Sequence, residues 1–145
     1  MCGEYMEKEF IDKIYDLALK SYDIDEIPVG AIIVRNGKII AEGINNREKN
    51  NSVVGHAEIN AIEKACSVVG DWRLDECEMY VTLLPCMMCS GAILESRLKK
   101  VYYLCDRTNV CFKTGSYINI TKINNELMEE KYLNLLRLFF ENKRK

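Results

Sequence analysis

The stretch Leu84-Pro85-Cys86-Met87-Met88-Cys89 places two cysteines three residues apart, directly after a proline. Side chains at that spacing lie on nearly the same side of a helix. Proline suits the first helical turn because its missing N–H costs no helical hydrogen bond, and the positive end of a helix favours thiolates. We therefore expect a helix to begin at this motif and to present Cys86 and Cys89 together as metal ligands.

His56-Ala57-Glu58, upstream of the cysteines, contains the only histidine in the chain. His56 and the two cysteines would make three zinc ligands, and a zinc ion with three protein ligands keeps a fourth position for water, as catalytic sites do. Glu58 would carry the protons of that water. Residues 56 and 58 would point about 200° apart within one helix, so we expect His56 at or before the first turn and Glu58 just inside it.

A redox pair is the alternative for Cys86 and Cys89, because Cys-x-x-Cys at a helix start also occurs in disulfide oxidoreductases. The nearby histidine and glutamate favour the metal site. The chain has seven cysteines, and an odd number in a reducing cell interior indicates ligands and buried thiols rather than a disulfide framework. Outside the motif, the cysteines expected to be free thiols in the core are Cys2, Cys66, Cys77, Cys105 and Cys111.

Length and composition fit a single domain spanning residues 1–145, since 145 residues with 48% hydrophobic content can bury a sizeable core. The first ten residues carry three glutamates and no long apolar run, so we expect neither a signal peptide nor a membrane span, and a cytoplasmic location. A net charge of −2 and a pI near 5.6 argue against a broadly basic nucleic-acid-binding surface. Lys143-Arg144-Lys145 is the best local patch for RNA, with a solvated tail as the alternative.

Hydrophobic periodicity predicts four helices and five strands. The helices are expected at about residues 7–22, 58–69, 86–98 and 125–140. The strands are expected at about residues 29–34, 38–44, 79–83, 101–104 and 116–120. Asn36-Gly37 predicts a tight hairpin turn between the first two strands, because both central residues of that turn need positive φ. Trp72, in a loop, is expected to anchor packing rather than to stack on a base.

The order of these elements predicts a mixed sheet. A strand, the cysteine-motif helix and a further strand form a βαβ crossover, which makes those two strands parallel. The first hairpin is antiparallel. Helices on both faces would complete a three-layer α/β domain, with the metal ligands at strand ends, where open α/β sheets bind ligands.

The pattern His-x-Glu followed by Pro-Cys-x-x-Cys resembles that of zinc-dependent nucleobase deaminases. Over about residues 10–142 the chain is similar to bacterial tRNA adenosine deaminases of the cytidine deaminase superfamily. This resemblance implies a three-layer α/β/α fold with strand order 2-1-3-4-5, one Zn²⁺ per subunit, a homodimer, and conversion of adenosine to inosine at the wobble position of a tRNA anticodon loop. The segments that carry it, besides the two metal motifs, are Pro28-Val29-Gly30-Ala31, Gly43-Ile44-Asn45 with Arg47, Tyr80-Val81-Thr82-Leu83 and Ser90-Gly91-Ala92.

The same resemblance implies a set of substrate contacts. Val29 would pack beneath the flipped base, Asn45 would hydrogen-bond it, and main chain near Ala57 and Pro85 would frame the ring. Phe140, in the Phe139-Phe140 pair before the basic ending, would help to hold the anticodon loop. The alternatives are that Asn45 is a turn residue beside Asn46 and that the phenylalanines belong to the core.

Two departures from the family pattern keep other functions open. Leu84 stands where the family usually has an acidic residue, and residues 105–116 differ from the usual loop Asp-x-Lys-x-Gly-Ala-x-Gly-Ser. One alternative is therefore deamination of a free base or nucleoside, such as guanine or cytosine, at the same zinc centre. Another is a noncatalytic zinc-stabilised or redox binding module.

Overall fold

A computed structural model describes residues 2–107 and 118–142 of the chain, with side chains from residue 7 onward. Its centre is a five-stranded sheet of order β2-β1-β3-β4-β5. The strand β1 pairs antiparallel with both β2 and β3, whereas β3, β4 and β5 run parallel. This confirms the predicted mixed sheet and its order 2-1-3-4-5. The strands are β1 (Gly30–Arg35), β2 (Lys38–Ile44), β3 (Cys77–Leu83), β4 (Lys100–Cys105) and β5 (Ile120–Lys122).

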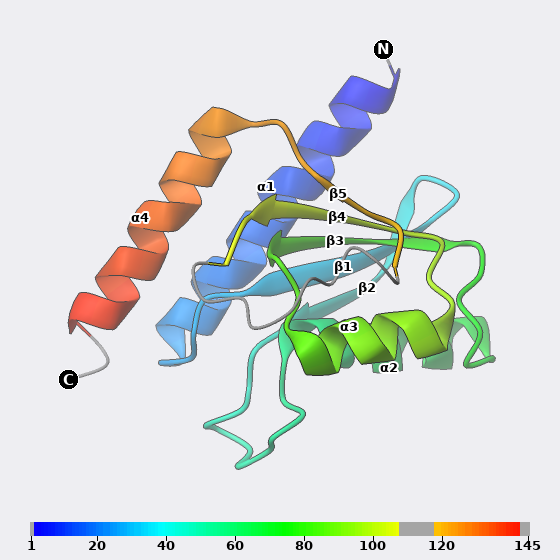
Figure 1. The fold of residues 1–145 in the computed structure, drawn as a ribbon, viewed down its shortest axis with the longest axis horizontal. Helices are drawn as coiled ribbons and strands as arrows, with labels where there is room; N and C mark the ends of the chain where they lie inside the picture. The colour runs from blue at the N-terminus through cyan, green and yellow to red at the C-terminus, as the bar shows by residue number, and fades with distance from the viewer. Residues whose placement is uncertain (1, 108–117, 143–145) are drawn as a thin grey trace.

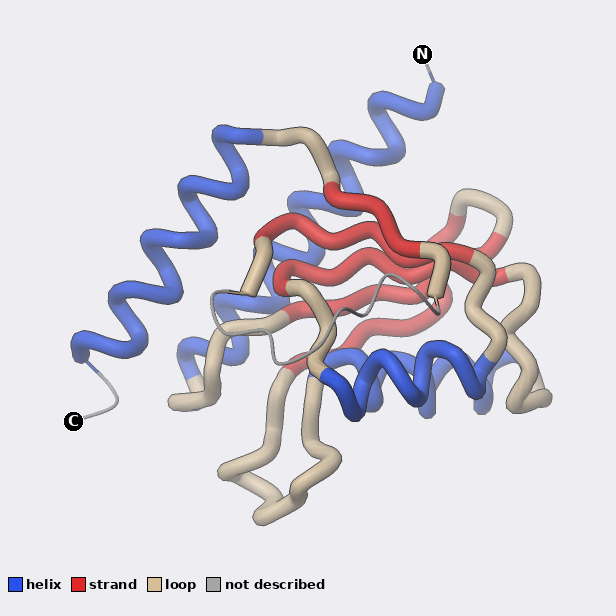
Figure 2. Tube along the Cα trace, in the orientation of Figure 1, coloured by secondary structure: helices blue, strands red, loops and turns tan. Residues whose placement is uncertain are grey.

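Helices cover both faces of the sheet. The first and last helices, α1 and α4, lie on one face, and α2 and α3 lie on the other (Figures 1 and 2). The three-layer α/β/α architecture is thereby confirmed. The helices are α1 (Cys2–Asp23), α2 (Ala57–Val69), α3 (Met87–Ser96) and α4 (Glu126–Asn142). Among the described residues, no helix is both long and apolar enough to cross a bilayer.

The strand β1 is the centre of the core. Its residues 30–34 are all buried, because helices pack on both sides of it and both faces must be apolar. The apolar face predicted for α1 packs on this strand and includes Phe10, Ile14, Leu17 and Ala18, all buried. The hairpin turn to β2 also has the predicted geometry, with φ of 51° at Asn36 and 76° at Gly37.

Gly43 sets the distance between β2 and α2. A Cβ at this position would collide with the carbonyl oxygen of Ala57 and would lie 2.7 Å from the amide nitrogen of Ala61. Only glycine lets the first turn of α2 come this close to the strand. The start of α2, and with it the position of His56, therefore depends on the missing side chain of Gly43.

Two expectations about local structure are wrong. The edge strand β5 is Ile120–Lys122, where it pairs with β4, whereas residues 118 and 119 of the expected strand 116–120 are not in a strand and residues 116–117 lie outside the described part of the chain. Trp72 is 50% exposed and is not a core anchor. Instead, its ring lies against two guanidinium groups. The ring centroid is 4.5 Å from Cζ of Arg73 and 5.2 Å from Cζ of Arg97.

The expected core thiols are partly confirmed. Cys77 and Cys105 are buried, and Cys66 is half-buried. Cys2 and Cys111 fall outside the described side chains. The basic ending at residues 143–145 and the loop at 108–114 also lie outside the described residues.

Candidate metal centre and substrate pocket

Two helix N-termini on the same face of the sheet bring the three metal-ligand candidates together. His56 occupies the N-cap position of α2 in an extended conformation, with φ −100° and ψ 150°. Cys86 occupies the N-cap position of α3, and Cys89 lies in the first turn of that helix. The predicted placement of His56 just before the helix, with Glu58 just inside it, is therefore observed.

The donor atoms of these three residues converge. Nδ1 of His56 lies 3.6 Å from Sγ of Cys86 and 3.4 Å from Sγ of Cys89, and all three donor atoms lie within 4.8 Å of one another. One imidazole nitrogen and two sulfurs are a ligand set that suits Zn²⁺. The residues present therefore fit one zinc ion.

The pKa values of the two thiols are shifted in opposite directions. Hydrogen bonding from the Cys89 thiol, assisted by His56 and opposed by burial, lowers the pKa of Cys86 to about 3. The same hydrogen bond, together with burial, raises the pKa of Cys89. In the protein without metal, Cys86 is thus the ionised thiol of the two. A divalent cation would favour ionisation of both sulfurs.

Glu58 lies beside the metal centre without being part of the ligand cluster. Its side chain is almost completely buried, at 2% exposure, and it lines the same pocket as His56 and Cys86. Burial raises the pKa of Glu58, and the thiolate of Cys86 adds to this rise. A carboxyl group with a raised pKa holds a proton more readily, which suits repeated proton uptake and release.

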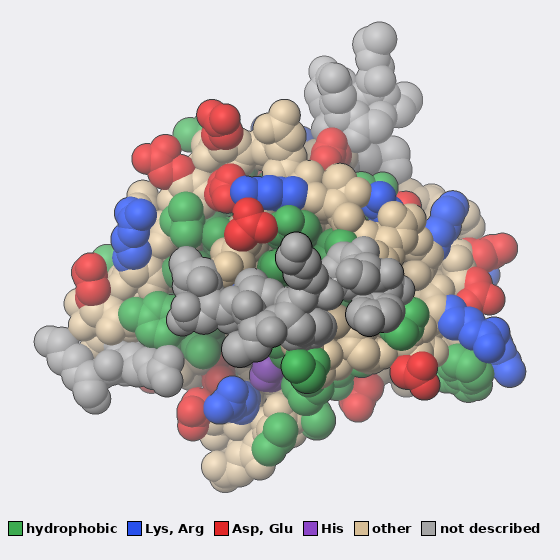
Figure 3. All heavy atoms as spheres, viewed as in Figure 1, with side chains coloured by type: hydrophobic (Ala, Val, Ile, Leu, Met, Phe, Trp, Pro, Cys, Tyr) green, Lys and Arg blue, Asp and Glu red, His purple; other side chains and the backbone are tan. Residues whose placement is uncertain are grey.

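A pocket of about 650 Å³ opens at this centre. Figure 3 shows the histidine at the molecular surface, close to hydrophobic and charged side chains. Three of the five predicted substrate-contacting residues, Val29, Asn45 and Phe140, line the pocket. The other two, Ala57 and Pro85, are buried and are not among the described lining residues. The pocket walls also include Asp25, Glu26, Ile27, Arg47, Glu48, Leu83, Asp106, Arg107, Leu133, Leu136 and Phe139.

Asn45 is more than a turn residue. Its Oδ1 accepts a hydrogen bond of 2.8 Å from the Ala57 N–H, and its Nδ2 donates one of 2.8 Å to the Ile27 carbonyl. These bonds fix the orientation of the amide. Because an amide oxygen has two lone pairs and its nitrogen two hydrogens, one acceptor and one donor site remain for a ligand in the pocket.

The chain segment before β1, which forms one side of the pocket, is held by side chains from several elements. The Tyr132 hydroxyl of α4 donates to the Pro28 carbonyl at 2.6 Å, and the Ser21 hydroxyl of α1 donates to the Val29 carbonyl at 2.8 Å. Asn45 holds the Ile27 carbonyl in the same way. These three bonds keep Val29 at a defined depth in the wall of the pocket.

Glu26 and Arg107 also line the pocket, although neither was among the predicted site residues. Glu26 is 2% exposed, and its carboxylate accepts hydrogen bonds from the N–H groups of Glu48 at 3.2 Å and Lys49 at 2.8 Å. It thereby anchors the loop of residues 46–55 at the mouth of the pocket. In the sequence, Glu26 is one of four consecutive residues after the first helix that only mark a break in helical period, and nothing there signals burial.

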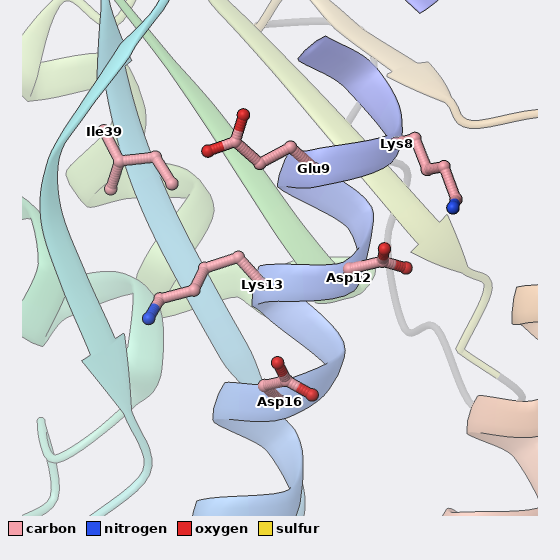
Figure 4. A pocket seen from close by; sticks show the side chains of 6 residues that line it. All are labelled: Lys8, Glu9, Asp12, Lys13, Asp16 and Ile39. Atoms are coloured by element: carbon pink, nitrogen blue, oxygen red, sulfur yellow. The ribbon is translucent and has the colours of Figure 1, made fainter. Parts of the chain in front are cut away.

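A second hollow, of about 420 Å³, lies along α1 (Figure 4). Side chains of both charge signs line it, and one of them, Lys13, forms an ion pair of 3.1 Å with Glu42 of β2. Such exposed pairs contribute little to stability. Its described lining contains no cysteine or histidine, so the metal chemistry belongs to the larger pocket. The lining residues are Lys8, Glu9, Asp12, Lys13, Asp16 and Ile39.

Comparison with known families agrees with this geometry. Residues 5–105 match the family model described as the cytidine and deoxycytidylate deaminase zinc-binding region. The chain belongs to this deaminase family. The matched range contains all three metal-ligand candidates and Glu58, so the zinc-binding region of the family coincides with the cluster that the fold assembles.

Individual deaminases are similar over different lengths. The tRNA-specific adenosine deaminase of Buchnera aphidicola subsp. Baizongia pistaciae is 37% identical, and the match covers 96% of this chain and 91% of the relative. The guanine deaminase of Bacillus subtilis is 49% identical, but over 57% of this chain and 53% of the relative. A solved structure from a study of A-to-I editing by tRNA:A34 deaminases superimposes with a TM-score of 0.79 at 29% identity, covering 88% of this chain and 99% of that one.

Proposed function

We propose that this deaminase is a zinc-dependent hydrolase that converts adenosine to inosine at position 34, the wobble position, of tRNA. The observation that carries the chemistry is the convergence of His56, Cys86 and Cys89 within 4.8 Å of one another beside the buried Glu58. The substrate is supported by the relatives named tRNA-specific adenosine deaminase, which are similar over nearly the whole chain.

His56, Cys86 and Cys89 would hold one zinc ion, which when bound lowers the pKa of water and so supplies the nucleophile. Glu58 accepts a proton as water attacks C6 of adenine and delivers it to the neighbouring N1. It then moves the remaining hydroxyl proton to the departing amine. The C6–N bond breaks, and the products are inosine and ammonia.

The pocket walls would select and orient the base. Val29 would pack beneath the ring, and the free donor and acceptor of Asn45 would read its edge. A polar group of this kind discriminates strongly, because the wrong base leaves it unpaired in a buried place. Main chain near Ala57 and Pro85 would frame the ring, and the half-exposed Phe140 would contact the neighbouring nucleotides.

The proposal includes a homodimer of a single cytoplasmic domain covering residues 1–145. Met87 and Leu94 are exposed apolar side chains seven residues apart on α3, and so lie on one side of that helix, where they would support self-association. Light scattering coupled to size exclusion is expected to give twice the chain mass. Replacing Leu94 by Glu would shift this value toward the monomer, whereas the same change at exposed Leu127 of α4 would not.

The test uses zinc-loaded protein with a tRNA anticodon stem-loop containing adenosine 34, alongside free adenosine, cytidine, cytosine and guanine. We expect inosine in the stem-loop and ammonia from it. A Glu58→Gln variant is expected to retain zinc while its rate falls about 10²- to 10⁴-fold, because it loses proton transfer only. A normal rate in this variant would refute the role of Glu58.

Deamination of a free base is the second candidate. The 49% identity to a guanine deaminase over 57% of this chain and the net charge of −2 favour it. Ammonia from guanine or another free base, with no inosine in the stem-loop, would establish this function and overturn the tRNA substrate. Full zinc occupancy with no turnover on any substrate would instead indicate a noncatalytic role.

A further inference from the structure

Arg107 is fixed at the mouth of the pocket by its own neighbours. It follows the end of β4, and its Nε donates a hydrogen bond of 2.6 Å to the Leu84 carbonyl, two residues before Cys86. The preceding carboxylate, Asp106, accepts hydrogen bonds from the Tyr103 hydroxyl at 3.0 Å and from Nζ of Lys122 at 2.8 Å. Residues 106 and 107 are therefore held by side-chain hydrogen bonds to β4, to β5 and to the segment before Cys86.

The bond to Leu84 leaves most of the Arg107 side chain available. A guanidinium has five N–H donors, and the contact through Nε uses one of them. In the described part of the chain, no carboxylate lies within ion-pair distance of Arg107. Arg107 lines the same pocket as His56, Glu58 and Cys86. Its unused donors therefore belong to the pocket that the substrate would enter.

Arg47 lies in the pocket wall from a different segment of the chain. The loop that carries it is anchored next to it, through the bonds from the Glu48 and Lys49 amides to buried Glu26. Its own carbonyl accepts a hydrogen bond of 2.9 Å from the Ser52 N–H. Like Arg107, Arg47 has no ion-pair partner among the residues that the structure describes.

The same wall carries the carboxyl groups of Asp25, Glu26, Glu48, Glu58 and Asp106, and two of these are engaged by other groups. The Glu26 carboxylate is occupied by two main-chain amides, and that of Asp106 by Lys122 and Tyr103. Within residues 2–107 and 118–142, Arg47 and Arg107 therefore remain as two guanidinium groups beside one pocket without an ion-pair partner. Guanidinium groups bind phosphate through paired, charge-assisted hydrogen bonds.

We infer that Arg107 and Arg47 form a phosphate-binding subsite at the mouth of the pocket, so that the enzyme takes a base carried on a phosphorylated chain rather than a free base or nucleoside. The inference rests on the proposed deaminase function and defines the substrate class of that same site. A neutral base carries no negative charge with which these guanidinium groups could form an ion pair. A nucleotide inside an RNA strand brings a phosphate on either side of the base that enters the pocket.

Binding is measured in the zinc-loaded Glu58→Gln background, so that turnover does not consume the ligand. The stem-loop is titrated by fluorescence anisotropy over a series of salt concentrations, with Arg107→Gln and Arg47→Gln as the test variants. Lys38→Gln is the matched control, because it also removes one positive charge. Lys38 is exposed at the hairpin between β1 and β2 and is not a lining residue of the pocket. Zinc content is measured for each protein.

Each arginine variant is expected to weaken stem-loop binding about tenfold and to reduce the slope of log Kd against log salt by about 0.7, the value for one lost phosphate contact on single-stranded RNA. A merely structural role would not change that slope in this way. Arginine variants that match Lys38→Gln in both affinity and slope would overturn the inference.

A second measurement separates this inference from the proposed function. Adenosine 5′-monophosphate and adenosine 3′-monophosphate are compared with adenosine in the same background. At least one monophosphate is expected to bind more tightly than adenosine, and this preference is expected to disappear in Arg107→Gln. If the wild type deaminates only a free base but the phosphate preference is present, the tRNA function fails and the subsite stands. If adenosine binds as tightly as both monophosphates, the subsite fails, whatever the stem-loop assay shows.

Discussion

The metal centre and the wall of the pocket are built in opposite ways. The ligands of the metal centre come from two short motifs at two helix starts, and each motif spans no more than four residues. The wall is held by bonds between distant parts of the chain, such as that from Tyr132 to Pro28, 104 residues apart. Local spacing therefore sets the chemistry, whereas long-range packing sets which molecule can reach it.

The largest effect is expected from breaking the metal centre. Cys86→Ala removes one of three ligands, so zinc stoichiometry should fall from about one per chain to nearly zero, and ammonia release should fall to background. Cys66→Ala is the matched control, because Cys66 is a free, half-buried thiol outside the cluster. Metal analysis and the stem-loop assay check both. A Cys86→Ala protein that keeps its zinc would show that this residue is not a ligand.

A smaller loss is expected where the two regions meet, at Gly43. Gly43→Ala forces a Cβ against the first turn of α2, and we expect the free energy of unfolding to fall by about 3 kcal/mol. Turnover should fall as well, because His56 and Glu58 shift with the helix. Gly91→Ala on α3 is the control: a Cβ there meets nothing within 4 Å, so stability should rise by about 0.5–1 kcal/mol. Urea denaturation measures both, and equal stability of the two variants would contradict the close approach.

Within the wall alone, Tyr132→Phe should have a moderate effect. The change leaves the buried Pro28 carbonyl without its donor, which should cost about 1–2 kcal/mol of unfolding free energy. Val29 is then less well held, so we expect KM to rise while zinc content stays unchanged. Tyr15→Phe is the control, because Tyr15, whose ring lies beside Lys131, is not among the described lining residues of the pocket. Loss of zinc from Tyr132→Phe would mean that wall and metal centre are not separable.

The smallest effect is expected at Asp106. Its hydrogen bond with Lys122 lowers the pKa of Asp106 below the ordinary value of 3.8. A lowered folded-state pKa stabilises the fold above the unfolded-state pKa, and this contribution is lost as pH falls through the folded-state value. Because the pair is half exposed, Asp106→Asn should cost only about 0.5 kcal/mol at pH 7. The difference from wild type in urea denaturation should shrink by pH 3. If the difference in unfolding free energy between Asp106→Asn and wild type grew as pH fell, the pKa of Asp106 would be raised rather than lowered.

Periodicity and motif spacing predicted most of the fold. The helix expected at residues 58–69 is Ala57–Val69, and the strand expected at 38–44 is Lys38–Ile44. Prediction failed where contacts with other elements determine the local structure. The ring of Trp72 lies at the surface against two guanidinium groups, and pairing with β4 determines where the edge strand β5 begins and ends.

The sequence by itself determined the reactive groups of this protein, because cysteines three apart and a histidine two residues before a glutamate have only a few geometries at helix starts. Tertiary structure alone decided the pocket around them. Glu26 is buried by the loop it anchors, and Arg107 faces the pocket because the Leu84 carbonyl lies within its reach. Such contacts depend on how separate elements come together in space, and no local pattern in the chain encodes them.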